Sequence, residues 1–280
     1  MTSNVARPGS GQSYAEVIGD PINHSLSPLI HGFWLDALKI DADYRRNRVD
    51  RASLPAYLAE RRTDPAWQGT NVTMPLKLDA LTAADEASDQ ALAAGAANLL
   101  TVRNGKLIAD NTDVGAIVLL LARLRTHGAA MASATVLGTG GAARGALVAL
   151  KMAGITSVRI HARDKPEAIK LAIEFGHDAE PAPLTAPIEG DGLVNATPLG
   201  MAGYEGLSCD LTRLSSHGWV FDMVTDPAET ALTAAARDRG LKVATGLDML
   251  VEQAATSFAI LFGEEPPRDR DGELWHKLRP

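Results

Sequence analysis

A single lysine ends the segment "GTNVTMPLK", residues 69–77. No acidic residue occurs in the seven positions before Lys77, and the first one after it is Asp79. A carboxylate brought near an ammonium group favours its charged form, so a partner supplied by the fold would make Lys77 a proton donor. Asp113, expected on the first turn of a helix, is a good candidate for that partner. The alternative reading of Lys77 is an ordinary surface cation.

Two serines lie close together in "NHSLSPLIH". In an extended segment, Ser25 and Ser27 would point to the same side, because side chains two positions apart do so. Ser27 is then expected as the N-cap of a helix with Pro28 at its first position. Two hydroxyl groups beside a helix N-terminus can bind a small anion such as a carboxylate. Simple capping by Ser27, with a passive Ser25, is the alternative.

The segment "ATVLGTGGAARGALVAL" reads as a strand, a glycine turn and a helix that opens near Ala142. Gly138, Gly140 and Gly141 would let the backbone turn tightly and approach a phosphate. Unpaired backbone N–H groups and the positive end of the helix dipole favour a pyrophosphate there. We therefore expect a bound dinucleotide, and a strand–helix turn without a ligand is the alternative.

The end of the following strand, "RIHARDK", bears on which dinucleotide binds. Sites for NAD commonly carry an acidic residue at this place to hold the ribose hydroxyls. Here Arg163 can clamp a 2′-phosphate with charge-assisted hydrogen bonds, which favours NADP. Asp164 follows at once and could hold a ribose, so NAD stays possible.

Alternation of β-rich and helical segments predicts an α/β protein with parallel sheets. We expect helices over 27–38, 111–128 and 248–262, strands over 14–20, 70–74, 157–163, 192–198, 219–224 and 241–246, and a hairpin over 98–110 with Asn104-Gly105 at its turn. A first domain would comprise residues 1–112, completed by C-terminal helices from about 247 to 280. A dinucleotide-binding domain would comprise residues 113–246.

Gln253 shares the apolar inner face of the last helix, where a bound polyol or a backbone group would satisfy its amide.

Composition excludes several classes of function. The 280 residues carry 27 basic and 34 acidic side chains, a net charge of −7 without a basic stripe, so no nucleic acid partner is expected. One cysteine, Cys209, excludes an internal disulfide or a thiolate cluster, and the scattered histidines predict no metal site. The N-terminus lacks an apolar signal segment and no apolar stretch is long enough to span a bilayer, so we expect a cytoplasmic protein without a membrane partner.

Taken together, eight segments resemble the shikimate dehydrogenase family in the order of that family. They are "IGDPINHSLSPLIH", "GTNVTMPLK", "GAANLL", "DNTDVG", "VLGTGGAARGA", "NATPLGM", "FDMVTDP" and "GLDMLVEQA", and they extend from about Val17 to Gly263. The resemblance implies an NADP-dependent oxidoreductase that interconverts 3-dehydroshikimate and shikimate in chorismate and aromatic amino acid biosynthesis. It also implies an N-terminal α/β substrate domain and a Rossmann-like, doubly wound parallel-sheet domain for NADP.

The resemblance further implies a role for individual residues. Lys77 and Asp113 would be the catalytic pair and would also contact the substrate. The other substrate contacts would be Ser25 and Ser27 to the carboxylate, and Thr73, Asn98 and Gln253 to the ring hydroxyls. The cofactor contacts would be Gly138, Thr139, Gly140, Gly141 and Ala142 to the phosphates, Arg163 to the 2′-phosphate with Asp164 beside it, and Met223 and Gly246 at the nicotinamide.

Four departures from the family leave the substrate open, one of them being the Ala109-Asp110 step in place of the glycine usual before the "NTD" segment. Thr225 stands where a tyrosine is usual near the substrate carboxylate, Leu99 replaces a threonine, and His31-Gly32 replaces His-Asn. A relative that oxidises quinate or an amino-substituted shikimate, possibly with NAD, is an alternative, although Ser27 argues against quinate. A nucleotide-binding regulator without chemistry is a second alternative, against which the retention of Lys77 and Asp113 argues. We expect a monomer or a homodimer.

Overall fold

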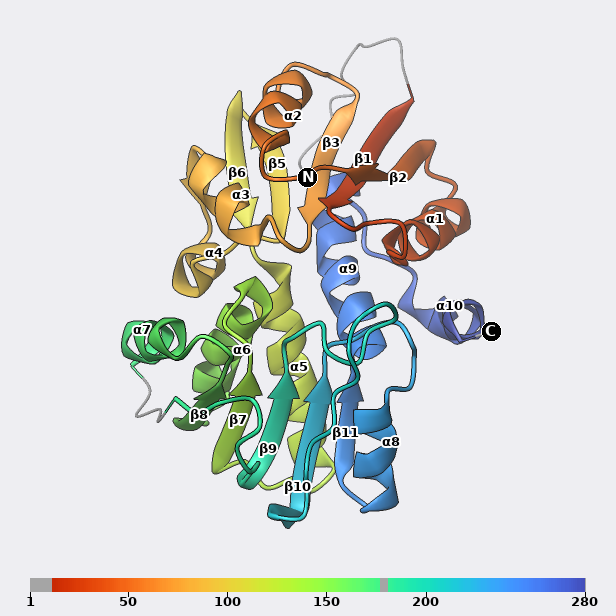
Figure 1. The fold of residues 1–280 in the computed structure, drawn as a ribbon. Coiled ribbons are helices and arrows are strands. Elements are labelled where there is room, and N and C mark those ends of the chain that lie inside the picture. Colours follow the sequence, from red (N-terminus) through yellow and green to blue (C-terminus); the bar gives the residue numbers. More distant parts are fainter. Residues whose placement is uncertain (1–11, 177–180, 280) are drawn as a thin grey trace. The chain divides into compact units, whose positions relative to one another are not determined.

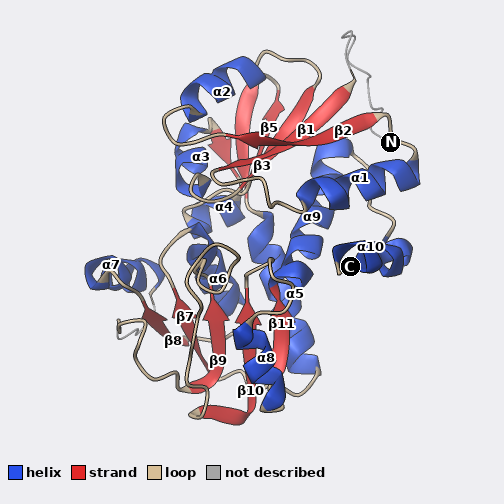
Figure 2. Ribbon diagram, turned by 45° about the vertical axis from the view of Figure 1, so that its right-hand side comes forward, coloured by secondary structure: helices blue, strands red, loops and turns tan. Residues whose placement is uncertain are grey.

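The computed structural model describes residues 12–176 and 181–279. The chain divides into two compact units (Figure 1). Unit 1 contains the chain up to Thr112 together with the chain from Ala254 onward, and unit 2 contains Asp113–Gln253. Each unit has its own sheet, covered by helices (Figure 2). None of the helices in the described chain combines the length and the apolar character needed to cross a bilayer.

The sheet of unit 1 is mixed. Its strands are β1 (Ser13–Gly19), β2 (Ala42–Arg48), β3 (Trp67–Val72), β4 (Glu86–Ala87), β5 (Leu99–Arg103) and β6 (Lys106–Asp110), in the order β2-β1-β3-β5-β6-β4. β1 pairs in parallel with both β2 and β3, whereas β5 and β6 form an antiparallel hairpin. Asn104 and Gly105 turn that hairpin with φ angles of 55° and 77°, which confirms the predicted turn.

Helices cover both faces of this sheet. They are α1 (Ser27–Leu38), α2 (Leu54–Arg61), α3 (Lys77–Ala83), α4 (Asp89–Ala94), the C-terminal part of α9 (Gly246–Phe262), and α10 (Asp271–Leu278), which follows the short 3₁₀ helix Arg268–Arg270. Helix α10 follows the helix that ends at Phe262 and lies within the region, about 247 to 280, where C-terminal helices were expected. Leu274 and Leu278 bury the apolar side of α10, a pattern too short to stand out in the sequence.

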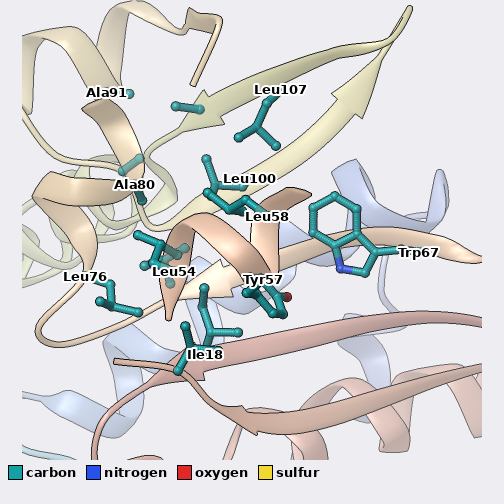
Figure 3. Close-up of a cluster of buried hydrophobic side chains, with 14 of the residues drawn as sticks. Ile18, Leu54, Tyr57, Leu58, Trp67, Leu76, Ala80, Ala91, Leu100 and Leu107 are labelled. Atoms are coloured by element: carbon teal, nitrogen blue, oxygen red, sulfur yellow. The ribbon is translucent and has the colours of Figure 1, made fainter. Parts of the chain in front are cut away.

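Two groups of apolar side chains hold unit 1 together. One lies between the sheet and helices α2 to α4 and includes Ile18, Leu58 and Trp67 (Figure 3). The other is aromatic and joins α1 to α9, since the rings of Trp34 and Phe258 pack edge to face with centroids 5.5 Å apart. The part of α9 from Ala254 onward is therefore an integral part of unit 1, although it is distant in sequence from the strands.

Unit 2 has a fully parallel sheet. Its strands are β7 (Ser133–Leu137), β8 (Ser157–His161), β9 (Gly190–Asn195), β10 (Leu214–Asp222) and β11 (Lys242–Thr245), in the order β11-β10-β9-β7-β8. Its helices are α5 (Thr112–Thr126), α6 (Gly141–Met152), α7 (Lys165–Phe175) and α8 (Ala231–Asp238). The strand order reverses between β7 and β9, as in doubly wound nucleotide-binding folds, which confirms the predicted fold class.

Candidate functional site

The two serines lie at the start of α1, but not in the predicted geometry. Leu26 is the N-cap, in a helical conformation and without a side-chain cap, and Ser27 is the first residue of the helix. The expected capping by Ser27 is thus wrong, because the turn formed by Ser25 N–H and the carbonyl of Ile22 starts the helical path earlier. Ser25 Oγ accepts a hydrogen bond from the backbone N–H of Ser27 at 3.3 Å. The two serines are therefore linked through the backbone of a turn rather than aligned along an extended segment.

A chain of buried polar side chains extends from Ser27 across unit 1. The Ser27 side chain is hydrogen-bonded to Tyr44, and the Tyr44 hydroxyl donates to Asn71 Oδ1 at 2.7 Å. Asn71 Nδ2 donates in turn to Ser257 Oγ at 2.8 Å, and Ser257 Oγ lies 3.1 Å from Thr112 Oγ1. Because these side chains are buried, each hydrogen bond restrains its neighbours strongly.

Asn98 closes the network at its other end. Its Oδ1 accepts from the Thr112 backbone N–H at 2.8 Å, and its Nδ2 donates to Thr112 Oγ1 at 2.9 Å. The backbone carbonyl of Asn98 accepts from Val72 N at 2.7 Å, at the end of β3. Thr112 is thereby held by two side chains, and it is the residue directly before Asp113.

His31 supports the network from the α1 side. Its ring stacks on Tyr44 with centroids 3.9 Å apart and an interplanar angle of 4°. The side chain is fully buried, and neither ring nitrogen has a hydrogen-bonding partner within the described chain. Burial lowers the pKa of His31 to about 3, so the ring is neutral and acts as a flat packing surface for Tyr44.

Lys77 is the first residue of α3 and is partly buried. Its backbone carbonyl accepts a hydrogen bond from Ala97 N at 2.8 Å, which places the start of α3 beside the segment that carries Asn98. Thr73 follows β3, and its N–H donates to Ile18 O at 2.9 Å. Asp79, the acid closest in sequence to Lys77, is paired with Arg51 at 3.1 Å. Thr73, Lys77 and Asn98 are thus carried by neighbouring segments of unit 1.

Asp113 and Gln253 are the first and last residues of unit 2. Asp113 is buried on the first turn of α5, where it follows the anchored Thr112. Gln253 is buried on α9, and its Nε2 donates to the Leu250 carbonyl at 2.9 Å. That bond is a backbone partner of the kind expected for an amide on an apolar helix face.

The glycine turn of unit 2 lies where the strand order reverses. Gly138 has φ 103°, and a Cβ there would lie 3.0 Å from Thr197 Cγ2 and 3.2 Å from the carbonyl oxygen of Ala196. Only glycine suits this conformation and this close approach of the loops after β7 and β9. At Gly140, the N-cap of α6, a Cβ would meet nothing within 4 Å. A narrow turn with open space over a twelve-residue helix fits a dinucleotide pyrophosphate.

Arg163 and Asp164 have different surroundings at the end of β8. Asp164 is the N-cap of α7, and its Oδ1 accepts from Glu167 N at 3.1 Å. Arg163 is exposed just before that cap. The carboxylate of Asp164 therefore has a structural partner that the sequence did not reveal, whereas the guanidinium faces solvent. Arg144, the arginine of the glycine segment, forms a bidentate ion pair with Glu174 at 2.6 and 2.7 Å and is engaged in packing α6 on α7.

The segment after β10 packs directly on Gly246. A Cβ at Gly246 would lie 2.3 Å from the Val224 carbonyl oxygen and 2.5 Å from that of Met223, so a larger residue would push the segment away. Asp222 anchors the segment by accepting hydrogen bonds from Asn195 Nδ2 at 2.9 Å, Thr230 Oγ1 at 2.6 Å and Val224 N at 3.2 Å. Burial raises the pKa of Asp222. Met223 and Gly246, predicted to serve one pocket, are thus neighbours in unit 2.

Four residues of the buried network escaped the sequence prediction: Tyr44, Asn71, Thr112 and Ser257. Asn71 and Thr112 occur in the segments "GTNVTMPLK" and "DNTDVG", which were already singled out for other residues. Nothing in the polar segment around Tyr44 marks it as buried. Within the described chain, no group of three or more His, Cys, Asp or Glu side chains is arranged to hold a metal ion.

Two models of known protein families match this chain, one in its N-terminal part and one near its C-terminus. The model of the shikimate dehydrogenase substrate binding domain matches residues 17–100, and the model of the shikimate 5′-dehydrogenase C-terminal domain matches residues 246–270. The shikimate dehydrogenase (NADP(+)) of Sphingopyxis alaskensis is 46% identical over 263 residues, which cover 93% of this chain and 95% of that protein.

Solved structures with the same fold include shikimate and quinate dehydrogenases. Shikimate 5-dehydrogenase from Thermus thermophilus, crystallised with NADP(H) and shikimate, has a TM-score of 0.82 and 34% identity, over 95% of this chain and 99% of that one. Quinate dehydrogenase from Corynebacterium glutamicum, in complex with NAD, has a TM-score of 0.80 and 29% identity, over 95% of this chain and 99% of that one. The resemblance seen in the eight sequence segments is thereby confirmed.

Proposed function

Since this chain belongs to the shikimate dehydrogenase family, we propose that it reduces 3-dehydroshikimate reversibly to shikimate with NADP(H). The observation that carries the proposal is the 46% identity with a curated NADP-dependent shikimate dehydrogenase over 93% of this chain. Such an activity belongs to chorismate and aromatic amino acid biosynthesis. The substrate is a small polyhydroxylated acid, and the chain offers hydroxyl, amide and ammonium groups suited to each part of it.

We assign the substrate carboxylate to Ser25 and Ser27. Ser25 Oγ accepts the Ser27 N–H, which leaves its own proton to donate to an anion. The Ser27 hydroxyl donates to Tyr44, whose own proton goes to Asn71, so Ser27 would have to redirect its proton to the carboxylate when the substrate binds. Thr73, Asn98 and Gln253 would bind the ring hydroxyls. Pre-set donors lose little entropy on binding, which favours a rigid polar ligand.

Lys77 and Asp113 are assigned as the catalytic pair. As the ring carbonyl is reduced, negative charge develops on its oxygen, and Lys77 donates the proton that neutralises it. Asp113 would orient the ammonium group and favour its charged form. In the reverse direction, Lys77 takes the proton from the hydroxyl of shikimate. Support for this assignment comes from the anchoring of Thr112 by Asn98 and Ser257, which restrains the backbone from which Asp113 extends.

Unit 2 is proposed to hold NADP. Gly138, Thr139, Gly140, Gly141 and Ala142 would bind its phosphates at the start of α6. Arg163 would bind the 2′-phosphate, with Asp164 beside it as the cap of α7, and Met223 and Gly246 would line the nicotinamide pocket. When bound, the cofactor supplies the hydride. The Asp222 cluster contributes by holding Met223 and Val224 in place. The protein is further proposed to act in the cytoplasm as a monomer or a homodimer.

A substrate and cofactor matrix tests the proposal. The four combinations of shikimate or quinate with NADP or NAD are compared by kcat/KM. We expect shikimate with NADP to exceed the other three combinations by at least about tenfold, a difference of about 1.4 kcal/mol in transition-state binding. Preference for quinate with NAD would instead support the quinate alternative. That alternative rests on Thr225 and Leu99, which depart from the motifs of the family. Stabilisation of the protein by NADPH without turnover of any substrate would point to a nucleotide-binding regulator.

A further inference from the structure

Arg46 is fastened to the turn that carries the two serines. It lies on β2, the edge strand of the sheet of unit 1, and is exposed. Its Nε and Nη2 both donate to the backbone carbonyl of Ser25, at 2.8 and 2.6 Å. The same residue, Ser25, receives the N–H of Ser27 on its hydroxyl oxygen. The guanidinium group thus contacts the backbone of Ser25, which carries one of the two hydroxyls assigned to the substrate carboxylate, and Ser27, two positions along, carries the other.

Arg46 differs from the other two arginines of β2 in the partner of its guanidinium group. Arg45 is paired with Asp43 at 2.7 Å, and Arg48 is paired with Asp20 at 2.9 Å. Across residues 12–176 and 181–279, no carboxylate forms an ion pair with Arg46, whose polar contact is a neutral carbonyl. Two of the three arginines on this strand are therefore neutralised locally, and the third presents a positive charge beside the serine turn.

The bidentate geometry also explains why this position suits arginine. A guanidinium offers two parallel N–H groups in a fixed fork, so it can hold the Ser25 carbonyl and keep its charge at a defined place. A lysine would supply the charge without the fork. The planar contact restrains the Ser25 backbone from the solvent side, whereas the Tyr44 hydroxyl restrains Ser27 from the buried side.

We propose that Arg46 is a specificity-determining residue that selects an ionised carboxylate at the serine turn. It acts through its charge and through its hold on Ser25, without being one of the groups that perform the reaction. The inference rests on the proposed function, because that function places a carboxylate at Ser25 and Ser27. Since the guanidinium is exposed, its effect is screened by salt and is modest, about three- to tenfold in substrate affinity at low ionic strength.

The test compares Arg46→Met with Arg45→Met, a matched removal of a neighbouring exposed arginine whose charge is already paired. KM and kcat for shikimate are measured at about 20 mM and about 500 mM salt, because the Debye length falls severalfold over this range. We expect Arg46→Met to raise KM about three- to tenfold at low salt, with less effect at high salt and kcat within about twofold. Arg45→Met should leave KM near the wild-type value. Arg46→Lys should show the salt dependence of the wild type with a smaller rise in KM.

A neutral analogue separates charge selection from loop support. Inhibition by the methyl ester of shikimate is measured in the wild type and in Arg46→Met. An inhibition constant that Arg46→Met leaves unchanged agrees with the inference. A loss shared equally by acid and ester, or equal effects of Arg46→Met and Arg45→Met on shikimate, overturns it. Failure of the wild type to oxidise shikimate would instead refute the proposed function, so the two ideas fail in distinguishable ways.

Discussion

Ser257 Oγ lies 2.8 Å from Asn71 Nδ2, although 186 positions separate the two residues in the chain. The same hydroxyl lies 3.1 Å from Thr112 Oγ1. One side chain of helix α9 thus restrains both the end of β3 and the residue before Asp113. Because all three groups are buried, loss of the hydroxyl leaves polar atoms without a full set of partners.

Replacing Ser257 with alanine should therefore lower both stability and turnover. We expect the free energy of unfolding to fall by about 1–3 kcal/mol, the usual cost of an unsatisfied buried polar group. Because Thr112 and Asn71 lose a shared anchor, kcat/KM for shikimate should fall by about ten- to a hundredfold, as small misplacements of catalytic groups do. Urea unfolding and steady-state kinetics measure the two effects.

Thr70→Val is the matched control for Ser257→Ala. The Thr70 hydroxyl is also buried in unit 1, but its acceptors are the backbone carbonyls of Glu16 and Asn71. This variant should lose a similar free energy of unfolding and keep kcat/KM within about twofold. If both variants reduce kcat/KM equally, Ser257 has a structural role without special importance for the substrate groups.

Lys77→Ala should abolish most of the chemistry while leaving the cofactor bound. Removal of a general acid typically costs about 10²- to 10⁴-fold in kcat. The affinity for NADPH, measured by fluorescence titration, should stay within about twofold of the wild type, because the glycine turn lies elsewhere in the fold. Lys106→Ala, which removes an exposed lysine paired with Glu86, is the control and should be fully active. Turnover near the wild-type value in Lys77→Ala would refute the assigned role.

Arg163→Ala should weaken NADP much more than NAD. A charge-assisted hydrogen bond contributes about 1.5–3 kcal/mol, so KM for NADP should rise by about ten- to a hundredfold while KM for NAD changes little. Arg159→Ala serves as the control, since it removes an exposed arginine that lies on β8 itself, four positions before Arg163. An equal loss for both cofactors would show that the guanidinium does not contact the 2′-phosphate.

His31 should make the protein less stable in mild acid. Its pKa is about 3 in the folded protein, against an ordinary value of 6.5, so between these values only the unfolded chain takes up the proton. Stability is therefore complete above about pH 6.5 and is lost as the pH falls, by up to about 1.4 kcal/mol per pH unit. Between pH 7 and about pH 5, this amounts to about 2 kcal/mol of the free energy of unfolding.

The variant His31→Phe tests this contribution, because it keeps a flat ring against Tyr44 and removes the titration. Urea unfolding at about pH 7 and pH 5 should show a smaller loss of stability for His31→Phe than for the wild type, by about 2 kcal/mol. His127→Asn, a change at an exposed histidine, should behave as the wild type. A pH dependence that is identical in His31→Phe and in the wild type would contradict the prediction.

Several features were predictable because they depend on short-range rules. The Asn104-Gly105 hairpin turn follows from the backbone angles that those residues tolerate. The glycine turn at Gly138 follows from the combination of strand, glycines and helix. By contrast, the capping role of Ser27 was mispredicted, because the turn through Ser25 starts the helix one residue earlier than the motif suggests.

The amino-acid sequence by itself determined the family, the α/β class and the residue types available for catalysis, because motifs, turns and periodic apolar positions are local properties. Only the tertiary structure decided which buried polar groups meet. Tyr44, Asn71 and Ser257 come from distant segments, and their hydrogen bonds form only when sheet and helices bring them together. It also decided that, among the described residues, Arg45 and Arg48 pair with carboxylates whereas Arg46 bonds to a backbone carbonyl. The physical reason is that ion pairs and hydrogen bonds form between groups that are close in space. The spacing of residues along the chain does not show which distant groups will be close.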